Sequence, residues 1–329
     1  MEKIVKKSIN LEEIKAANED DLFYFVDNNT LMSERITAPK YSYWKSVFRV
    51  FFKKKINWFI IGLLVLVLIM TFIFPAIVPF NEFANVKDLA GQRLGPGDAL
   101  AHFGSWEYIF GSGFTGEPIF TAIWHSARIS LLLATICAAI NMTIGILAGA
   151  LWGYSKRADM LLNFLYNIIA NIPYILLITV LVYIIGAGFG PFIFALTITG
   201  WIGIAYFFRT QVMIIRDREY NLASRCLGTR TLKVVTRNVL PFLVSVIVTI
   251  LATELPSYIS MEVFLTYIGT GLDATLPSLG HMISAGQGSF MTYPWIFWPP
   301  VAISAVITIV LYVLGQNLAD ASDPRSHMQ

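Results

Sequence analysis

Two segments of the 329-residue chain contain residue types that could do chemistry. Residues 217–241 are polar and rich in arginine, yet they lie between long apolar runs. Glu254-Leu255-Pro256 places a carboxylate and a proline inside one of those runs. Neither segment sets a nucleophile beside a base, so no enzyme activity is expected of the chain. The chemistry on offer is non-covalent: binding a partner, and lining a polar path.

Within residues 217–241 the sequence predicts a short helix that starts at Glu219, because a carboxylate complements the positive end of the helix dipole. Gly228 is placed to end this helix in a left-handed conformation, and Thr229 or Thr231 could cap the helix that follows. One face of the short helix carries small or apolar residues: Leu222, Ala223, Cys226 and Leu227. Such a helix fits a groove on a partner protein, and it equally fits an amphipathic connector resting on lipid headgroups.

An ionised carboxylate at the centre of a membrane helix costs on the order of 2.5–3.5 kcal/mol on insertion scales, so Glu254 needs a local reason. Pro256 cannot donate to the carbonyl of Ala252 and is expected to kink its helix. One interpretation places Glu254 and Pro256 on a translocation pathway. The other leaves Glu254 protonated or bonded to a polar side chain of a neighbouring helix. Glu262, about two turns further on, is expected at an outer gate or in a structural contact.

These residues have to be positioned by membrane-spanning helices. Apolar residues make up 56% of the chain and charged residues 14%, with a mean hydropathy of +0.64. Such values lie outside the range of soluble proteins, and the predicted fold class is an all-α membrane protein. Because a hydrocarbon core needs about 20 apolar residues in a helix, six segments qualify as spans. They are residues 57–79, 130–154, 161–187, 192–215, 239–267 and 294–314.

Lysine and arginine predict the orientation of these spans. With both termini in the cytoplasm, 21 of the 24 Lys and Arg residues lie on the inner side. The predicted order is a cytoplasmic tail (1–56), a first span (57–79), an extracellular loop (80–125) and a five-helix core (126–325) with its cytoplasmic loop at 217–241. The tail lacks the apolar region of a secretory signal. Its basic amphipathic stretch, residues 44–55, either lies on the inner leaflet or simply flanks the first span.

Ligand-binding motifs are scarce in the sequence. His102, His125 and His281 have no close ligand spacing, so no metal site is expected. No Gly-x-x-x-x-Gly-Lys-Ser/Thr phosphate loop occurs, so the chain is not expected to bind ATP by that route. Energy for transport then has to come from a partner or from an ion gradient.

The polar loop resembles a known family. Ala223, Ser224, Gly228 and Leu240-Pro241 have the spacing of the signature loop of ABC importer permeases: Glu-Ala-Ala, three residues, Gly, nine residues, Ile-x-Leu-Pro. The resemblance covers roughly residues 105–325 and is to the C-type permease subunit of the oligopeptide/dipeptide/nickel branch. Further matching residues are Phe110-Gly111-Ser112, Gly116, Ala127-Arg128-Ile129-Ser130-Leu131, Gly200-Trp201, Arg209, Glu219-Tyr220, Pro277-Ser278-Leu279-Gly280, Pro294-Trp295 and Asp320-Ala321-Ser322-Asp323-Pro324.

The sequence also departs from the family pattern. The glutamate of the signature is Leu222 here, its second alanine is Ser224, and its isoleucine is Asn238. In an outer motif, Ser112-Gly113 stands where Thr-Asp is usual, and Gly116-Glu117-Pro118 where Gly-Arg-Asp is usual. Because the glutamate is absent, the expected contact of this loop with an ATPase is mainly apolar.

The resemblance implies one permease subunit of an ATP-driven oligopeptide importer in the bacterial plasma membrane, forming half of its translocation pathway. The implied partners are a homologous permease that completes a heterodimer, two cytoplasmic ATPase subunits that hold ATP and Mg²⁺, an extracellular peptide-binding lipoprotein, and membrane lipid. No cofactor on this chain and no nucleic acid are implied. The ATPase-coupling residues would be Glu219, Leu222, Ala223, Ser224, Cys226, Leu227 and Gly228, and the pathway residues Glu254 and Pro256. An ion-coupled secondary transporter, or an ABC permease for dipeptides or nickel, remains an alternative.

Overall fold

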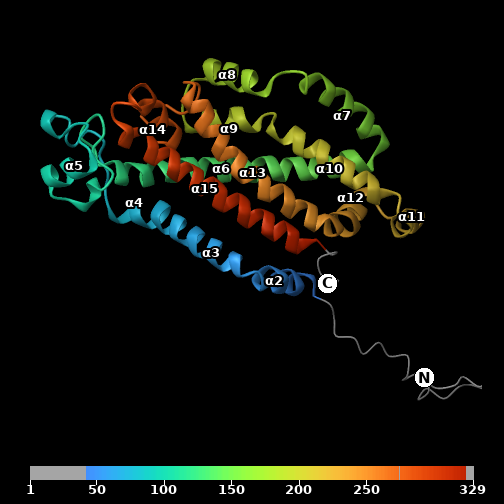
Figure 1. The fold of residues 1–329 in the computed structure, drawn as a ribbon. Helices are drawn as coiled ribbons and strands as arrows, with labels where there is room; N and C mark the ends of the chain where they lie inside the picture. Colours follow the sequence, from blue (N-terminus) through green and yellow to red (C-terminus); the bar gives the residue numbers. More distant parts are fainter. Residues whose placement is uncertain (1–41, 274, 324–329) are drawn as a thin grey trace, which may run out of the picture. The chain divides into compact units, whose positions relative to one another are not determined.

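The structure is a computed structural model that describes residues 42–273 and 275–323. Most of the predicted tail, residues 1–41, lies outside the described residues, as does Pro324 of the C-terminal motif. The regular elements of the described residues are all helical, with one isolated antiparallel bridge between Ser112 and Pro118 (Figure 1). The predicted all-α membrane fold is therefore confirmed.

Five helical stretches are long and apolar enough to cross a membrane, and a sixth is added if one bent pair counts as a span. Two of them are single helices, α6 (Ile119–Tyr154) and α15 (Pro294–Ser322). The first stretch consists of α3 (Lys55–Leu68), a π-helical turn and α4 (Phe74–Ile77). The remaining two are α9 (Phe189–Thr197) with α10 (Gly200–Arg216), and α12 (Thr231–Val234) joined by two irregular turns to α13 (Val244–Tyr267). These stretches correspond to five of the six predicted spans.

The third predicted span, residues 161–187, is broken rather than continuous. It consists of α7 (Lys156–Ile169) and α8 (Tyr174–Ile185), whose axes differ by 79°. The break ends at Pro173, which lacks a backbone donor and disfavours helical geometry in the residue before it. Hydropathy alone could not show this break, because the residues on both sides of it are apolar.

The second span begins earlier than predicted. α6 starts at Ile119, so residues 119–125 of the predicted extracellular loop are helical. At about 1.5 Å per residue, the 36 residues of α6 exceed the thickness of the hydrocarbon core. Arg128 interrupts the apolar run, which is why hydropathy placed the start near residue 130 although the helix continues beyond it.

Helices α6 and α10 pack closely against each other, and a stripe of glycines on α6 makes this possible. Gly145, Gly149 and Gly153 recur every fourth residue and lie on the same side of α6. A Cβ atom at Gly145 would lie 2.8 Å from the Ile204 side chain, and one at Gly149 2.9 Å from the Cβ of Phe208. Small residues of this kind let two backbones approach closely in a membrane. Residues with larger side chains at these positions would not fit between α6 and α10.

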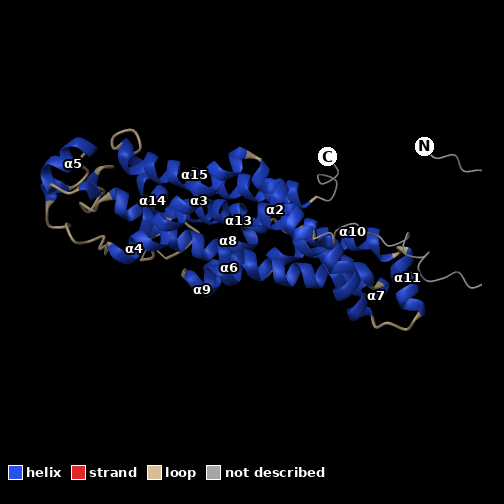
Figure 2. Ribbon diagram, turned by 90° about the horizontal axis from the view of Figure 1, so that it is seen from below, coloured by secondary structure: helices blue, strands red, loops and turns tan. Residues whose placement is uncertain are grey.

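The predicted extracellular and cytoplasmic loops lie at opposite ends of the helices. α5 (Pro96–Phe103) is at one end, close to α14 (Leu279–Gly286), and α11 (Glu219–Cys226) is at the other end (Figures 1 and 2). The spans between them run from one end to the other. This arrangement agrees with two loops on opposite membrane faces.

An amphipathic helix, α2 (Tyr43–Lys53), precedes the first span, as the basic stretch predicted. Val47 and Phe51 are buried on one side of it. Trp44, Phe48 and Phe52 are exposed and form a row of aromatic rings whose neighbouring centroids are 6.3 Å apart. Aromatic rings next to basic residues are typical of a helix that lies in a membrane interface.

Candidate functional site

The short helix predicted in the polar loop is α11 (Glu219–Cys226), with Glu219 in its first turn. Gly228 has a φ of +75°, so the predicted left-handed end of this helix is confirmed. The amide of Gly228 donates to the carbonyl of Arg225 at 2.9 Å, and the amide of Thr229 donates to that of Ser224 at 3.1 Å. These two bonds are the Schellman arrangement that closes a helix at a left-handed residue.

The expected threonine cap of the next helix is wrong. The N-cap position of α12 is Arg230, and it makes no side-chain cap bond. Thr229 is one residue too early, because its amide closes α11, and Thr231 is already inside α12. The turn between the two helices is therefore set by Gly228 and not by a hydroxyl.

The predicted apolar face of α11 is turned away from the rest of the chain. Leu222 is 42% exposed and Leu227 is 85% exposed. Ala223 and Cys226, between them on the same face, are exposed as well. We call these four residues the coupling face. An apolar face left open at the end of a membrane protein is the kind of surface that a groove on a partner covers.

The opposite side of α11 is held by polar contacts that the sequence alone did not reveal. Asn221 is fully buried, and its Nδ2 donates to the carbonyl of Ile215 at 3.0 Å. Nδ2 of Asn238 donates to Oδ1 of Asn221 at 3.3 Å and to Oγ of Ser224 at 3.2 Å. Ser224 and Asn238 are two of the departures from the family signature, and they contact each other. We call Asn221, Ser224 and Asn238 the amide clamp.

Two arginines, one on α11 and one at the end of α10, contact the end of α6. The guanidinium of Arg225 lies over the ring of Tyr154, 5.6 Å from its centroid. Nη1 of Arg216, at the end of α10, donates to the carbonyl of Gly153 at 3.0 Å. These contacts connect α11 and α10 to α6, and α12 and α13 follow α11 in the chain.

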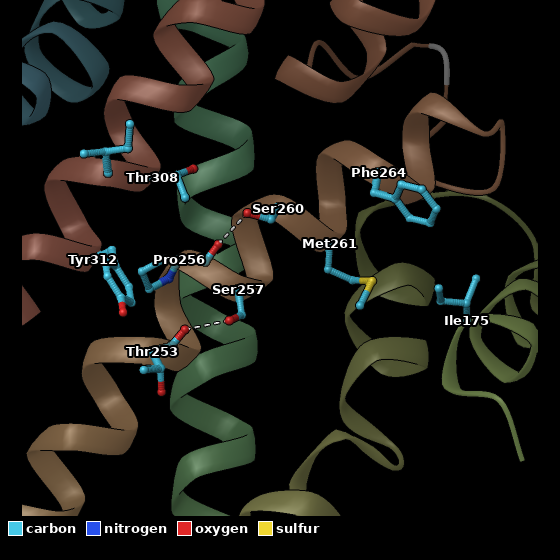
Figure 3. A pocket seen from close by; sticks show the side chains of 10 residues that line it. Ile175, Thr253, Pro256, Ser257, Ser260, Met261, Phe264, Thr308 and Tyr312 are labelled. Atoms are coloured by element: carbon cyan, nitrogen blue, oxygen red, sulfur yellow. Dashed lines mark hydrogen bonds between the residues drawn. The ribbon is translucent and has the colours of Figure 1, made fainter. Parts of the chain in front are cut away.

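The predicted pathway residues, Glu254 and Pro256, line two adjacent cavities and are separated in sequence from the coupling face. Pro256 lines the larger cavity, of about 610 Å³, between α8, α13 and α15 (Figure 3). Glu254 lines the smaller one, of about 270 Å³, between α8, α10 and α13. Ser257 and Met261 belong to the walls of both cavities. The larger cavity is lined by Ile175, Thr253, Pro256, Ser257, Ser260, Met261, Phe264, Thr308, Ile309 and Tyr312.

Glu262 makes a structural contact, the second of the two expectations for it. It is fully buried, and Oγ of Ser130 donates to its Oε2 at 2.7 Å. The same hydroxyl accepts from the amide of Leu279 at 3.1 Å. The contact joins α6, α13 and α14, and Ser130 and Leu279 both belong to the segments that resemble the family.

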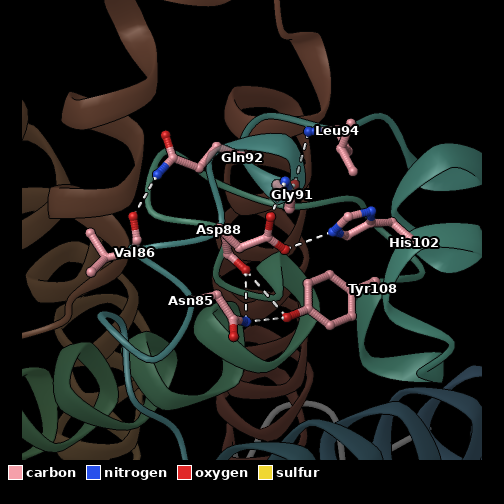
Figure 4. Close-up of polar contacts among 10 residues, drawn as sticks. Asn85, Val86, Asp88, Gly91, Gln92, Leu94, His102 and Tyr108 are labelled. Carbon is pink, nitrogen blue, oxygen red and sulfur yellow. Dashed lines mark hydrogen bonds and ion pairs between the residues drawn. The ribbon is translucent and has the colours of Figure 1, made fainter.

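Residues 80–118 form a folded cap at the far end from α11 (Figure 1), and Figure 4 shows polar contacts within this cap. Nδ2 of Asn85 donates to the hydroxyl of Tyr108 at 2.6 Å, and that hydroxyl donates to the carbonyl of Gly116 at 3.2 Å. Burial raises the pKa of Tyr108 to about 12, which keeps its proton available for this bond. Nε2 of His102 lies 2.6 Å from Oδ2 of Asp88, and this bond lowers the pKa of the Asp88 carboxyl.

Two departures in the outer motif occupy one space in this cap. A side chain at Gly113 would overlap the carboxylate of Glu117. Oε2 of Glu117 instead accepts from the amide of Thr115 at 2.8 Å and from its hydroxyl. Burial raises the pKa of the Glu117 carboxyl. The two departures therefore depend on each other: a side chain at Gly113, where aspartate is usual, would collide with Glu117, which stands where arginine is usual.

The histidines of the sequence lie apart from one another. Nε2 of His125 is 3.0 Å from the carbonyl oxygen of Val78, and His102 pairs with Asp88. Over residues 42–273 and 275–323, no group of three or more His, Cys, Asp or Glu is placed to hold a metal ion.

Two family models match the sequence. A model described as "Binding-protein-dependent transport system inner membrane component" matches residues 141–327. A second, described as "N-terminal TM domain of oligopeptide transport permease C", matches residues 42–96. The first includes the coupling face and both cavities, and the second includes α2 and the first span.

Whole-length relatives agree with these matches. The chain is 45% identical over 307 residues to the oligopeptide transport system permease protein AmiD of Streptococcus pneumoniae (strain ATCC BAA-255 / R6). The aligned residues cover 93% of this chain and 97% of the relative. It is 30% identical over 309 residues to the dipeptide transport system permease protein DppC of Bacillus subtilis (strain 168), covering 93% of each. The oligopeptide transport system permease protein OppC of the same organism is 30% identical over 317 residues, covering 96% of this chain and 97% of the relative.

Proposed function

The chain belongs to the family of inner membrane components of binding-protein-dependent transport systems, and we propose that it is the C-type permease subunit of an ATP-driven importer of oligopeptides. It is a multi-pass membrane protein. The observation that carries the proposal is α11, a closed helix with an open apolar face at the end of the spans. The substrate class is supported by the 45% identity to an oligopeptide permease.

The proposal includes the partners that such a subunit needs. A homologous permease forms the other half of the pathway, and two ATPase subunits supply ATP hydrolysis with Mg²⁺, one of them gripping the coupling face. A peptide-binding lipoprotein delivers substrate at the cap end. The chain itself contributes no catalytic residue and no cofactor. Membrane lipid surrounds the spans, with α2 lying on the inner leaflet.

The mechanism transmits motion without chemistry on this chain. Closure of the ATPase subunits displaces α11 through the coupling face. The amide clamp and the Arg225–Tyr154 contact keep α11 fixed to its neighbours, so the displacement reaches α13 and the α6–α10 pair. Glu254 on α13 and Gly200 on α10 both line the smaller cavity. Relative movement of these helices changes the shape of the cavities and their access.

The test is peptide uptake by the assembled importer in proteoliposomes. Ala223→Trp enlarges the coupling face, and Gly228→Val places a β-branched residue at a φ of +75°. Both variants are expected to abolish uptake while the chain stays in the membrane. Ala223→Ser, which changes the size of the same side chain little, is the matched control and should retain uptake.

The same preparation separates the alternatives. Uptake that depends on ATP and on all subunits supports the proposal. Uptake by this chain alone, driven by an ion gradient, would establish a secondary transporter instead. Normal uptake by both Ala223→Trp and Gly228→Val would rule out α11 as the coupling element.

A further inference from the structure

The smaller cavity has a polar lining that transmission of motion does not require. Its walls include the carboxylate of Glu254 and the hydroxyl groups of Tyr174, Thr199, Ser257 and Tyr258. Gly200 and Gly203 complete the wall on α10, and a Cβ atom at Gly203 would meet no atom within 4 Å, so the space beside it is open. None of the lining residues is a lysine or an arginine. Glu254 is therefore an acid without a basic partner among the residues that line this cavity.

Hydrogen bonds hold two tyrosines in the wall of this cavity. Nδ2 of Asn141, which is fully buried, donates to the hydroxyl oxygen of Tyr258 at 2.6 Å. Tyr258 lies one helical turn after Glu254 on α13, and both residues line the cavity. The hydroxyl of Tyr174 donates to the carbonyl of Leu196 at 2.9 Å, at the end of α9. Side chains held in this way are preorganised for a ligand, because they lose little freedom when it binds.

Two further acceptors beside the cavity have no partner among the described residues. They are Oγ1 of Thr199, which lines the cavity, and Oδ1 of Asn141, next to Gly200. A Cβ atom at Gly200 would lie 3.2 Å from that Oδ1, so only glycine leaves room there. Buried polar atoms are nearly always paired. Both atoms are closed off from solvent, so a ligand in the cavity reaches them only if the wall opens.

The chemistry of these groups defines the ligand. A carboxylate among hydroxyl groups, with no basic residue in the lining, suits a primary ammonium group, which has three donors and no acceptor. The α-amino group of a peptide has a pKa of about 7.7–8.0 and is mostly an ammonium at neutral pH. The larger cavity, which shares Ser257 and Met261, is lined by no charged residue and suits the remainder of a peptide of varied sequence.

We propose that the Glu254 cavity binds the α-ammonium of the transported peptide, with Glu254 as its counter-ion. The assignment rests on the proposed function and makes it more specific: the permease recognises a free peptide amino terminus. It also gives a role to the broken third span, because Tyr174 stands directly after the break between α7 and α8 and forms one wall of the cavity.

The experiment measures equilibrium binding of radiolabelled trialanine and of N-acetyl-trialanine to the complete importer in nanodiscs, without the binding protein. Wild type is expected to bind trialanine roughly tenfold or more tightly than the acetylated peptide, the factor typical of a charge-assisted hydrogen bond. Glu254→Gln should bind both peptides equally. Asp320→Asn neutralises an exposed acid that pairs with Lys54 and serves as the charge-matched control, with the wild-type ratio retained.

Several outcomes overturn the assignment. They are a wild-type ratio near one, an unchanged ratio in Glu254→Gln, or no binding of trialanine at millimolar concentration. The assignment is also contradicted if sodium ions displace trialanine from Glu254→Gln and from wild type to the same extent. Basal ATP hydrolysis and subunit composition show whether each variant is assembled, and Thr199→Val, which lacks only a hydroxyl, should lower the ratio by a smaller factor. Failure of the proposed function looks different, because peptide would then not stimulate ATP hydrolysis in the wild-type importer at all.

Discussion

Removing the amide clamp should loosen α11 without unfolding the rest of the chain. In Asn238→Ala, the bonds of Nδ2 to Asn221 and Ser224, at 3.3 and 3.2 Å, are lost. Both bonds are long, so each contributes at the lower end of about 0.5–1.5 kcal/mol. Asn221 is fully buried, and leaving its Oδ1 without a donor costs about 1–3 kcal/mol. Ser224 loses less, because its Oγ still donates to the carbonyl of Tyr220 at 3.0 Å.

These contributions amount to roughly 2 kcal/mol against the docked position of α11. At 1.4 kcal/mol per factor of ten, the open population of α11 should rise about 30-fold. Hydrogen exchange of the amides of residues 219–228 in the assembled importer measures this directly. Peptide-stimulated ATP hydrolysis should fall in parallel, while basal hydrolysis is retained.

Matched variants isolate the clamp. Thr236→Ala removes a hydroxyl that bonds only to carbonyl oxygens of its own helix, and exchange of α11 should stay at the wild-type rate. Ser224→Ala should have a smaller effect than Asn238→Ala, because Asn221 keeps its donor. Exchange of residues 219–228 in Asn238→Ala at the wild-type rate would refute the reasoning, and so would an equal increase over the whole chain.

Three further predictions concern the packing of the spans and the cap. Gly149→Leu forces a side chain against Phe208 and should prevent close packing of α6 on α10, which is measured as loss of the assembled importer in size-exclusion chromatography. Ser130→Ala removes the donor to Oε2 of the buried Glu262 and the acceptor of the Leu279 amide, so the free energy of unfolding should fall by about 1–3 kcal/mol, seen as a lower thermal midpoint. Because burial raises the pKa of Glu117 above its ordinary 4.5, its stabilising contribution is complete below that value and is lost as the pH rises through the raised pKa. Glu117→Gln should remove this pH dependence from hydrogen exchange of residues 80–118.

Each of these predictions has a clear contrary result. An intact importer with Gly149→Leu would mean that the α6–α10 contact is not needed for assembly. A thermal midpoint of Ser130→Ala equal to wild type would mean that water replaces the serine. A cap that becomes more stable from pH 4.5 to pH 8 in wild type, after correction for intrinsic exchange, would contradict the sign derived for Glu117.

The sequence was sufficient for those features that depend on local pattern. Five of the spans follow from apolar runs of sufficient length, and the match to the oligopeptide permeases confirms the resemblance stated from the signature loop. The position of α11 and the left-handed Gly228 follow from a short polar helix that a glycine ends. The coupling and pathway roles of these residues remain predictions for the experiments above.

Contacts between distant residues left no local pattern to read. Asn221 and Asn238 are 17 residues apart, and Ser130 and Glu262 are 132 residues apart. One sign was available, since Ser224 and Asn238 both depart from the signature in a polar direction and are in fact partners. The glycine repeat of α6 was a second sign, because residues at every fourth position lie on the same side of a helix.

In the proposed mechanism, an ATPase subunit binds this permease at α11. The most direct test is the rate of maleimide labelling of Cys226, an exposed thiol on the coupling face, with buried Cys137 as the internal reference. In the permease without its ATPase subunits, Cys226 should react quickly and Cys137 should not. When the ATPase subunits are bound, labelling of Cys226 should fall to the level of Cys137. Rapid labelling of Cys226 in the fully assembled importer would contradict the account.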